Sequence, residues 1–503
     1  MTNGSLSKRR FISGAVAAFG LNASQPVAKA YAETLYDLIV MGGGTAGLAC
    51  AVSAAEKGAS VLLIEKADRF GGTLFLSGGS IAAAGTRLQE RKGIKDSPDM
   101  HFADIMKLGH NKGDPSIIRR YVDSAAEMVD WLEVLGFEAA EGQPTVGGGG
   151  HAPFSVARYF GGSEGGRSLV KVLLPALQKH TMAGLVKALV STTVAELVIG
   201  RDKSVQGVIA VSAGQRTKFS ARKVVIASGG YCYSPEMFKR VTGYKLHSRG
   251  AFPMNVGEGL LLGESAGGFV RGGEHQIFGP GSIVKDRNYP SEVQARPQVD
   301  HNRRPQWEIQ VNALGQRYVR EDHPEPDLRD KIFTKQPTGR IWIVFDQYIW
   351  ENAPFILAGM KRADIEPLFN FHPMYFKGAT VEELAVRASL DPENLKRTVE
   401  EYNIGVRTKT DSLGRTFLPA EIAQSPFYAM EVSGWNLVGF GGLATNAEMQ
   451  ILRADGGVVQ NLYAAGEVVG LAAICGDLVV GGSAITASLT FGRIVGQSAL
   501  GRT

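Results

Sequence analysis

Short apolar runs and the segment between them predict the first elements of the chain. Tyr36–Met41 (YDLIVM) and Ala59–Ile64 (ASVLLI) contain β-branched residues and have the length of buried strands. Between them, Leu48–Lys57 (LACAVSAAEK) is rich in alanine and has the composition of a helix that Gly58 ends. A strand, a helix and a second strand in this order predict an α/β fold.

Three later segments extend this pattern. Lys223–Ile226 (KVVI) predicts a strand, and the run that begins at Asn461 (NLYAAGE) predicts another, each followed by glycine. Near the end of the chain, the turn Gly481–Ser483 leads into an almost uncharged segment that predicts a helix. By contrast, the polar stretch Lys285–Gln306 is rich in proline and arginine and predicts a loop.

The composition is that of a globular protein with an unusual amount of glycine. The 503 residues are enough for two or three domains, and 44% of them are hydrophobic. The 63 glycines cluster in short motifs, which indicates places where the backbone approaches a ligand or another element closely. The net charge of +5 is spread along the chain without a basic block, so we expect no nucleic-acid partner.

The cysteines indicate neither a metal site nor a disulfide framework. Cys50, Cys232 and Cys475 match no zinc or haem spacing, and their number is odd. We therefore expect no metal and interpret all three as small buried residues.

Residues 1–32 have the features of a signal peptide. The basic run Lys8–Arg10 is followed by the weakly apolar Ser13–Leu21 and by small-residue cleavage sites near Ala30. The sequence SKRRFI is similar to a twin-arginine export signal, so we expect an exported, periplasmic or extracytoplasmic protein; a disordered basic tail is the alternative. No other segment is long and apolar enough to anchor the chain in a membrane.

The turn after the first strand has the spacing of a dinucleotide-binding site. Its six residues, Gly42–Gly47 (GGGTAG), stand between the predicted strand and helix, and Glu65 ends the second strand. The first glycine allows the turn, the second lets the backbone reach a pyrophosphate, and the third lets helix and strand pack closely. Glu65 is expected to accept hydrogen bonds from a ribose. The predicted contacts are Gly42, Gly44, Thr45, Ala46, Gly47, Glu65 and Lys66.

Further glycine clusters favour FAD over NAD as the dinucleotide. Two of these clusters follow Glu65 directly, where the ribityl chain and ring of a flavin continue past the first turn. A third cluster follows the strand that ends at Ile226, and the last one precedes Glu467. The predicted contacts in these clusters are Gly72, Thr73, Ser77, Gly78, Gly79, Ala227, Ser228, Gly229, Gly466 and Glu467.

Together these motifs resemble the FAD-dependent flavoproteins of fumarate reductases and succinate dehydrogenases, a family that includes the 3-ketosteroid Δ1-dehydrogenases. The resemblance implies a discontinuous Rossmann-like FAD domain, residues 33–272 and 430–503, and an inserted α+β capping domain, residues 273–429. Ile309–Tyr318 is similar to the family's VN-x-x-G-x-R-[FY] hairpin in the cap, and Thr380–Leu384 and Leu395–Asn403 are similar to helices of that domain.

The resemblance also implies how the flavin is held. The turn at Gly482 and Ser483, with Ala484 and Ile485 in the helix that follows, is expected to point backbone N–H groups at the N1/C2=O edge of the flavin, where a helix N-terminus stabilises negative charge. In covalent members of the family, a histidine precedes the threonine of the second glycine cluster. Gly72 occupies that place, so we expect FAD without a covalent link.

The positions that hold a dicarboxylate in soluble fumarate reductases differ here. Phe278 occupies the place of one histidine, Leu437–Gly442 contains no second histidine, and Val480 precedes the last Gly-Gly in place of an arginine. The segment Leu328–Lys331 (LRDK) is similar to the one that carries the proton-donating arginine, here Arg329. Because three of these contacts would be apolar, we expect a less charged substrate than fumarate or succinate.

The ketosteroid dehydrogenase branch offers a catalytic tyrosine upstream of a Gly-Gly-Arg segment. Tyr159 matches it, and Arg158 was considered either as a cation that lowers the tyrosine's pKa or as a carboxylate ligand; a buried structural tyrosine is the alternative. His151 and Asp477 are further candidates for the pocket, and Tyr375 for binding an enolate oxygen.

These residues favour a FAD-dependent dehydrogenase that forms a C=C bond next to the carbonyl of a small cyclic ketone. Tyr159 would be the base, and a quinone, a soluble carrier or oxygen would accept the electrons. One alternative is the reverse reaction, reduction of an activated C=C bond with Arg329 or Tyr159 as proton donor. The other is a flavin-binding sensor without turnover.

Overall fold

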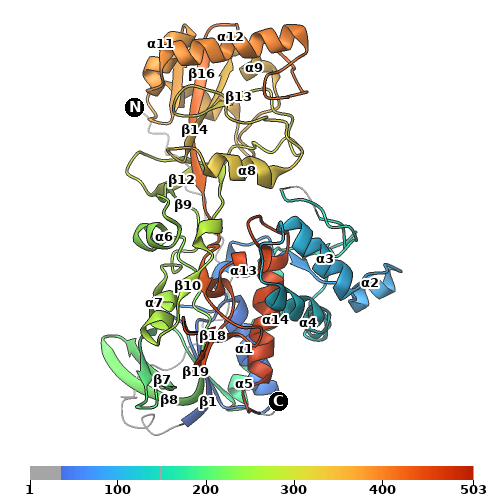
Figure 1. Cartoon of the computed structure of the whole chain (residues 1–503), viewed down its shortest axis with the longest axis vertical. Coiled ribbons are helices and arrows are strands. Elements are labelled where there is room, and N and C mark those ends of the chain that lie inside the picture. The colour runs from blue at the N-terminus through green and yellow to red at the C-terminus, as the bar shows by residue number, and fades with distance from the viewer. Residues whose placement is uncertain (1–34, 148–149, 502–503) are drawn as a thin grey trace, which may run out of the picture.

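The chain folds around two β-sheets that lie toward opposite ends of its long axis (Figure 1). The computed structural model describes residues 35–147 and 150–501, so the signal peptide predicted for residues 1–32 lies outside the described residues. We call the region around the eight-stranded first sheet the lower lobe and the region around the seven-stranded second sheet the upper lobe.

The first sheet has the strand order β18-β19-β8-β1-β2-β5. Strand β7 also pairs with β8, and β6 pairs with β7. Its central pairs are parallel, with Leu38 opposite Val61 and Val40 opposite Val225. The strands are β1 (Leu35–Met41), β2 (Val61–Ile64), β5 (Val186–Leu189), β6 (Thr193–Ile199), β7 (Val205–Ser212), β8 (Gln215–Ile226), β18 (Gln450–Leu452) and β19 (Val458–Ala464).

Both faces of this sheet are covered, which explains the continuous apolar runs. In β1, Leu38 and Val40 pack into one hydrophobic core, whereas Ile39 and Met41 pack into the other. A parallel sheet buried on both faces requires this composition. The predicted strand–helix–strand unit at the start of the chain and the α/β fold are therefore confirmed.

The helices of the lower lobe cover one face of the sheet and extend to its side (Figure 1). Helices α1 and α14 pack directly against each other at the centre. The helices outside the upper lobe are α1 (Thr45–Glu56), α2 (Arg87–Arg91), α3 (Pro98–Leu108), α4 (Pro115–Val134), α5 (Gly166–Met182), α6 (Pro235–Thr242), α7 (Glu258–Ser265), α13 (Ala472–Cys475) and α14 (Ser483–Gln497). Two short ribbons accompany them, β3 (Ile81–Ala82) with β4 (Tyr159–Phe160) and β10 (Val270–Arg271) with β17 (Gly442–Leu443).

The second sheet has the order β13-β14-β16-β11-β12-β9, with β15 paired to β16. Its strands are β9 (Ser248–Arg249), β11 (Gly279–Val284), β12 (Ser291–Ala295), β13 (Ile309–Val311), β14 (Arg340–Asp346), β15 (Tyr375–Gly378) and β16 (Phe427–Trp435). Strand β9 precedes residue 273 and β16 spans residue 429, so the ends of this sheet do not coincide with the domain boundaries expected from the sequence. The expectation of a loop over Lys285–Gln306 is wrong at β12, whose polar residues pair at the sheet margin with β11 and β9.

The upper lobe contains α8 (Pro326–Thr334), α9 (Gln347–Asn352), α10 (Arg362–Ile365), α11 (Val381–Ala388) and α12 (Pro392–Thr408). The two predicted helices of this region lie within α11 and α12 and are confirmed. Side chains at their starts explain the boundaries: Thr380 accepts a hydrogen bond from the Glu383 N–H, and Asp391 accepts one from the Asn394 N–H.

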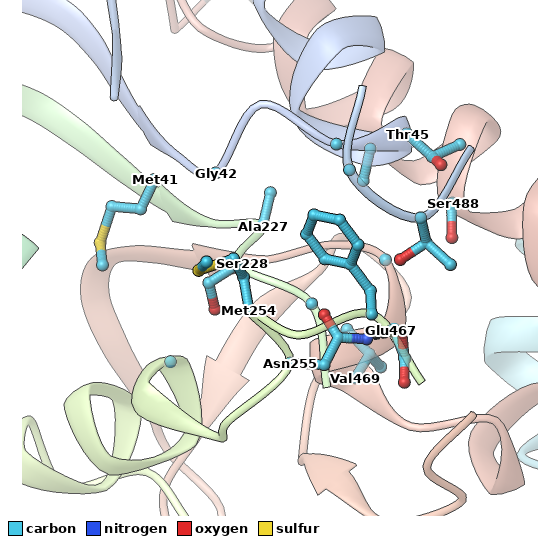
Figure 2. Close-up of a pocket in the computed structure, with 18 of the residues that line it drawn as sticks. Met41, Gly42, Thr45, Ala227, Ser228, Met254, Asn255, Glu467, Val469 and Ser488 are labelled. Atoms are coloured by element: carbon cyan, nitrogen blue, oxygen red, sulfur yellow. Dashed lines mark hydrogen bonds between the residues drawn. The ribbon is translucent and has the colours of Figure 1, made fainter. Parts of the chain in front are cut away.

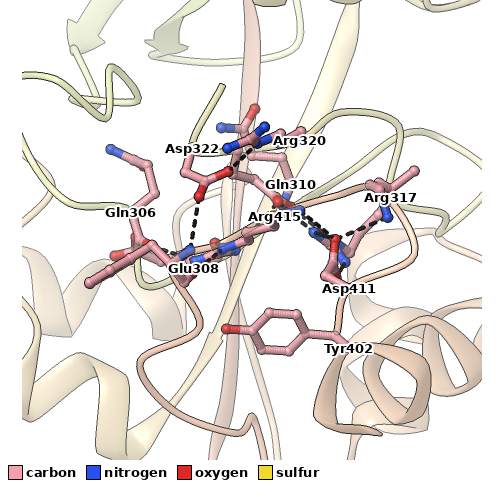
Figure 3. Close-up of polar contacts among 12 residues, drawn as sticks. Gln306, Glu308, Gln310, Arg317, Arg320, Asp322, Tyr402, Asp411 and Arg415 are labelled. Carbon is pink, nitrogen blue, oxygen red and sulfur yellow. Dashed lines mark hydrogen bonds and ion pairs between the residues drawn. The ribbon is translucent and has the colours of Figure 1, made fainter. Parts of the chain in front are cut away.

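A buried ionic cluster joins the β13 hairpin to the segment after α12 (Figure 3). Arg317 donates to Glu321 at 2.6 Å and to Asp411 at 2.5 Å, and Arg415 lies 3.4 Å from Glu321. All four side chains are buried, and such charges are tolerated only when they are paired. Arg317 in the VN-x-x-G-x-R-[FY] motif therefore has a structural role in this chain.

Within the described residues, no helix combines the length and apolarity needed to cross a membrane.

Candidate functional site

An elongated cavity lies at the carboxyl ends of the parallel strands of the first sheet (Figure 2). The residues directly after β1, β2, β8 and β19 line it, together with the first turns of α1 and α14. Ligands bind at this edge in open α/β sheets, because the strand order changes there and loops leave a crevice. The fold therefore brings the predicted glycine motifs to one cavity.

The first glycine turn has the geometry that its spacing predicts. Gly42 adopts φ +103°, and a Cβ there would lie 2.4 Å from the Ala227 carbonyl oxygen. A Cβ on Gly44 would meet nothing within 4 Å, so its position faces open space at the cavity. A Cβ on Gly47 would lie 1.8 Å from the Gly42 carbonyl oxygen. Gly47 thus allows close packing and Gly44 leaves room for a ligand beside the backbone.

The start of α1 offers unpaired N–H groups to this space. Helix α1 begins after Gly44 without a side-chain cap, and its first turn carries no acidic residue. Such a helix N-terminus binds phosphate through its free N–H groups and its dipole. Glu65, at the end of β2, accepts hydrogen bonds from the N–H groups of Gly43 and Ala67, both at 2.7 Å, and lines the cavity.

Helix α14 brings a second free N-terminus to the same cavity. It begins after Gly482, whose φ is +77°, again without a side-chain cap or an acidic first turn. Cβ atoms on Gly492 and Gly496 would lie 2.3 Å from the carbonyl oxygens of Ala46 and Cys50 on α1. The two helices therefore touch backbone to backbone, which fixes both N-termini at one site.

Glu467, like Glu65, is an acid that lines the cavity (Figure 2). It accepts hydrogen bonds from Asn255 Nδ2 at 2.9 Å and from the Gly439 N–H at 3.2 Å. Burial raises the pKa of Glu467 to about 7, although the hydrogen bonds from Gly439, Asn255 and Gly230 oppose this shift. The carboxyl group can therefore be neutral or charged near neutral pH.

Most residues predicted to contact the cofactor line this cavity: Gly42, Gly44, Thr45, Ala46, Glu65, Lys66, Gly72, Thr73, Ser77, Ala227, Ser228, Gly229, Gly466, Glu467, Ala484 and Ile485. Five others do not, and they are Gly47, Gly78, Gly79, Gly482 and Ser483. A Cβ on Gly79 would meet the Gly165 backbone at 2.3 Å, and one on Gly482 would meet Ile81 at 2.8 Å. Gly79 and Gly482 therefore serve chain packing, and a side chain at Gly482 would meet β3.

Several lining residues were not predicted from the sequence. They come from segments without a motif, among them Thr192, Met254, Asn255, Glu258 and Ile474. Glu258 forms an ion pair with Lys66 at 2.7 Å. No local spacing links these residues to the glycine turns, because only the tertiary fold brings them together.

The cavity fits the adenine dinucleotide of a flavin by the chemistry of its walls. Two uncapped helix N-termini suit a pyrophosphate and the electron-rich edge of the ring. Glu65 suits a ribose, and the open space beside Gly44 admits a ligand close to the backbone.

Tyr159 lies beside the turn that starts α14. Its hydroxyl donates to Ser80 Oγ at 2.6 Å, and a Cβ on Gly481 would lie 3.3 Å from its ring. Arg158 does not share this position. Its guanidinium is fully buried and binds Asp96 at 2.7 and 2.9 Å and Asp104 at 2.6 Å. Both roles considered for Arg158, as a cation beside the phenol or as a substrate ligand, are therefore corrected.

Tyr375 is also corrected as a catalytic candidate. It lies in the aromatic core of the upper lobe, 5.4 Å from Phe369 and 5.0 Å from His372 between ring centroids. Its hydroxyl is buried without a hydrogen-bond partner, and burial raises the pKa of Tyr375 above its ordinary value. It contributes nothing to the cavity lining.

Arg329 is bound within the upper lobe. It donates to the Val299 carbonyl oxygen at 2.7 Å and to Asp300 Oδ1 at 2.8 Å, and its side chain is 8% exposed. It is not among the cavity-lining residues, and its role as a proton donor stays a prediction.

Helix α8 of the upper lobe faces the glycine-rich turn before α14. His151 Nδ1 lies 3.0 Å from Asp327 Oδ1, and Lys331 pairs with Asp477. Asp477 also lies 2.9 Å from His110 Nδ1. Burial raises the pKa of Asp477, but the hydrogen bonds and charges of Lys331 and His110 lower it below its ordinary value overall. The two lobes therefore meet through polar bridges near the end of the cavity.

Comparison with known proteins identifies the family. A family model described as "FAD binding domain" matches residues 37–477. The probable fumarate reductase Ifc3 of Shewanella frigidimarina is 29% identical over 92% of this chain and 74% of its own length. The NADH:fumarate oxidoreductase of Klebsiella pneumoniae is 30% identical over 99% of this chain, which spans about half (52%) of that relative.

A solved structure gives the same result. The open conformation of a flavocytochrome c3 fumarate reductase superposes with a TM-score of 0.69 and 27% sequence identity, over 93% of this chain and 78% of that one. The chain therefore belongs to the flavoprotein family of fumarate reductases and succinate dehydrogenases, FAD-dependent oxidoreductases that act on carbon–carbon double bonds.

Proposed function

We propose that this enzyme reduces a carbon–carbon double bond that is activated by a neighbouring carbonyl group. The arrangement at Tyr159 carries the proposal. Arg158, the cation expected beside this phenol, binds two aspartates instead, and the Tyr159 hydroxyl donates a hydrogen bond to Ser80 Oγ. A neutral phenol is a hydrogen-bond donor and not a base. A hydrogen-bond donor can polarise a substrate carbonyl, as reduction of the C=C bond requires. It is less suited to abstract a proton, as dehydrogenation requires.

In this proposal the lower lobe holds FAD without a covalent link and the upper lobe is the cap. The free N–H groups of α1 would bind the pyrophosphate, Glu65 a ribose, and the start of α14 the ring edge. Gly72 lines the cavity and offers no side chain for a covalent bond. When bound, FAD supplies or accepts a hydride. Export, as the sequence of residues 1–32 predicts, and an external electron carrier complete the proposal.

The substrate is proposed to carry less charge than a dicarboxylate. Phe278, at the position of a dicarboxylate-binding histidine, packs in the core at 5.8 Å from Phe333 between ring centroids. Phe440, in the segment expected to carry the second histidine, is 2% exposed. Neither can offer a charge-assisted hydrogen bond, each of which contributes about 1.5–3 kcal/mol.

Anaerobic half-reactions test the direction and the substrate class together. Holoenzyme reduced with dithionite is mixed with 2-cyclohexenone, and oxidised holoenzyme with cyclohexanone, while the flavin absorbance is followed. We expect the enone to reoxidise the flavin faster than the ketone bleaches it, and faster than fumarate reoxidises it. If cyclohexanone bleaches the oxidised flavin faster than 2-cyclohexenone reoxidises the reduced flavin, the enzyme is a dehydrogenase and the proposed direction is wrong. If fumarate reoxidises the flavin faster than 2-cyclohexenone does, the proposed substrate class is wrong.

Dehydrogenation of a cyclic ketone is the second candidate. The same apolar residues, Phe278 and Phe440, favour a ketone as much as an enone. The comparison of the two half-reactions separates these functions.

A further inference from the structure

His151 occupies a place that the assignments above do not explain. It comes from the lower lobe, yet its Nδ1 is bound to Asp327 Oδ1, in the first turn of α8 in the upper lobe, at 3.0 Å. The Asp327 side chain is 5% exposed, whereas that of His151 is 39% exposed. The carboxylate is thus fixed in the protein, while part of the imidazole reaches solvent.

His151 lies beside the turn that precedes α14, and the first turn of that helix lines the cavity where we propose reduction. A Cβ on Gly481 would lie 3.3 Å from the Tyr159 ring and 3.9 Å from the His151 Cβ. The same turn starts α14, whose residues Ala484 and Ile485 line the cavity. Tyr159 and His151 therefore flank one turn at the start of that helix.

The charges around His151 favour its protonated form. Burial lowers the pKa of His151, but the hydrogen bond and charge of Asp327 and the charge of Asp330 raise it above its ordinary value overall, against the opposing charge of Arg303. An ionised carboxylate only accepts hydrogen bonds, so Nδ1 keeps its proton and Nε2 carries the proton that can be transferred.

We propose that His151, oriented by Asp327, is the proton donor of the reaction; the inference rests on the proposed function. The π bond of the substrate breaks as one carbon gains a hydride, with two electrons, from the reduced flavin. The other carbon forms its C–H bond with the proton of His151 Nε2, which leaves a neutral imidazole. Solvent returns the proton through the exposed side of the ring. Because Tyr159 has a single O–H, the phenol turns from Ser80 to donate its hydrogen bond to the carbonyl oxygen in this step.

The chain offers a matched control for this pair. His110 is bound through Nδ1 to Asp477 at 2.9 Å and also lies where the lobes meet. The three atoms nearest to a Cβ on Gly481 belong to Tyr159 and His151, and none belongs to His110. The variants to compare are His151→Gln, Asp327→Asn and His110→Gln, each as FAD-loaded enzyme. FAD content and a melting curve establish that each variant is folded.

The first readout is the rate at which 2-cyclohexenone reoxidises reduced enzyme between pH 5.5 and 9. General acids contribute about 10²–10⁴-fold, so we expect His151→Gln to slow the step at least 100-fold and to remove its pH dependence. Asp327→Asn is expected to shift the midpoint of the pH profile downward, because the carboxylate that raises the pKa is gone. His110→Gln should stay within about threefold of the unchanged enzyme.

The second readout does not depend on turnover. Sulfite adds to oxidised flavins and its affinity responds to nearby positive charge, so its dissociation constant is measured by flavin absorbance across the same pH range. We expect binding to weaken as pH rises through the His151 titration, and this step to vanish in His151→Gln but persist in His110→Gln.

The outcomes separate the two proposals. If 2-cyclohexenone fails to reoxidise any form while the sulfite step depends on His151, the proposed function fails and the position of His151 at the flavin holds. An unchanged rate profile and an unchanged sulfite titration in His151→Gln would overturn the inference. A second result would also overturn the inference: Arg329→Lys loses the pH-dependent step of reoxidation, whereas His151→Gln keeps it. Arg329 would then be the proton donor.

Discussion

Two glycines of the first glycine turn have different roles, and this difference gives a prediction that can be worked out in detail. Gly44 leaves room for a ligand, whereas Gly47 allows close packing of the backbone. A methyl group at Gly44 would enter open space at the cavity, and the residue's φ of −83° and extended ψ suit alanine. A methyl group at Gly47 would lie 1.8 Å from the Gly42 carbonyl oxygen, which is backbone and cannot move aside. Gly44→Ala should therefore affect the ligand, and Gly47→Ala the fold.

The magnitudes follow from these contacts. For Gly44→Ala, we expect the unfolding free energy of the FAD-free protein to change by less than about 0.5 kcal/mol. The added methyl would hold the pyrophosphate away from at least one N–H group, at a cost of about 1.5–3 kcal/mol. At about 1.4 kcal/mol per tenfold change, FAD should bind roughly 10- to 150-fold more weakly. For Gly47→Ala, overpacking should destabilise the fold by about 1–3 kcal/mol or more.

Fluorescence titration of the FAD-free protein with FAD and a urea unfolding curve measure both quantities. Wild-type affinity in Gly44→Ala would refute the position of the pyrophosphate beside Gly44. Equal loss of stability in both variants would refute the distinction between packing and ligand contact.

Four further predictions concern single side chains. Glu467→Gln should alter the pH dependence of stability: the folded pKa of about 7 lies above the ordinary 4.5, so the folded state binds more protons between these values and stability falls as pH rises through that window. The urea midpoint of FAD-free wild type should drop between pH 5 and 7.5, and that of the variant should drop less, because Asp330, whose pKa burial also raises to about 7, remains. Arg158→Met should destabilise the protein by about 3–5 kcal/mol, because it leaves two buried aspartates without their cation; an unchanged melting temperature would contradict this. Tyr375→Phe removes a buried hydroxyl without a partner and should leave stability equal or slightly higher; a lower melting temperature would reveal a hydrogen bond in solution. Tyr159→Phe should slow reoxidation by 2-cyclohexenone about 10- to 150-fold, the loss of one hydrogen bond to developing charge, with FAD content unchanged; an unchanged rate would remove Tyr159 from the reaction.

Local chemistry determined what the sequence could predict. The turn at Gly42–Gly47 has a spacing that only a few backbone geometries satisfy, so its place between strand and helix, and the role of each glycine, followed from the sequence. The uncharged segment after Gly482 also predicted helix α14 correctly, but Gly482 and Ser483, which were expected to contact the flavin, are not among the cavity-lining residues. In each case the signal lies within a few residues along the chain.

The side chains that depend on distant partners were predicted less well. Arg158 stands next to Tyr159, but its side chain turns to Asp96 and Asp104, more than fifty positions earlier. Arg158 directly precedes β4 (Tyr159–Phe160), and neighbouring residues of an extended segment point to opposite sides, so adjacency to Tyr159 was a poor guide to contact. Likewise, nothing in the sequence near Asn255 indicates that it binds Glu467, because the pairing arises from the path of the chain between the lobes.

The backbone contact between α1 and α14 has a consequence for how the enzyme is made. Neither helix alone forms the cavity, since its walls include Gly44 and Thr45 at the start of α1 and Ala484 and Ile485 in the first turn of α14. A ribosome must therefore finish everything between Glu56 and Ser483 before the nascent polypeptide can capture its prosthetic group. Cofactor binding therefore comes late in synthesis. A truncated product that lacks α14 lacks part of the cavity wall, and we expect it to show no flavin absorbance.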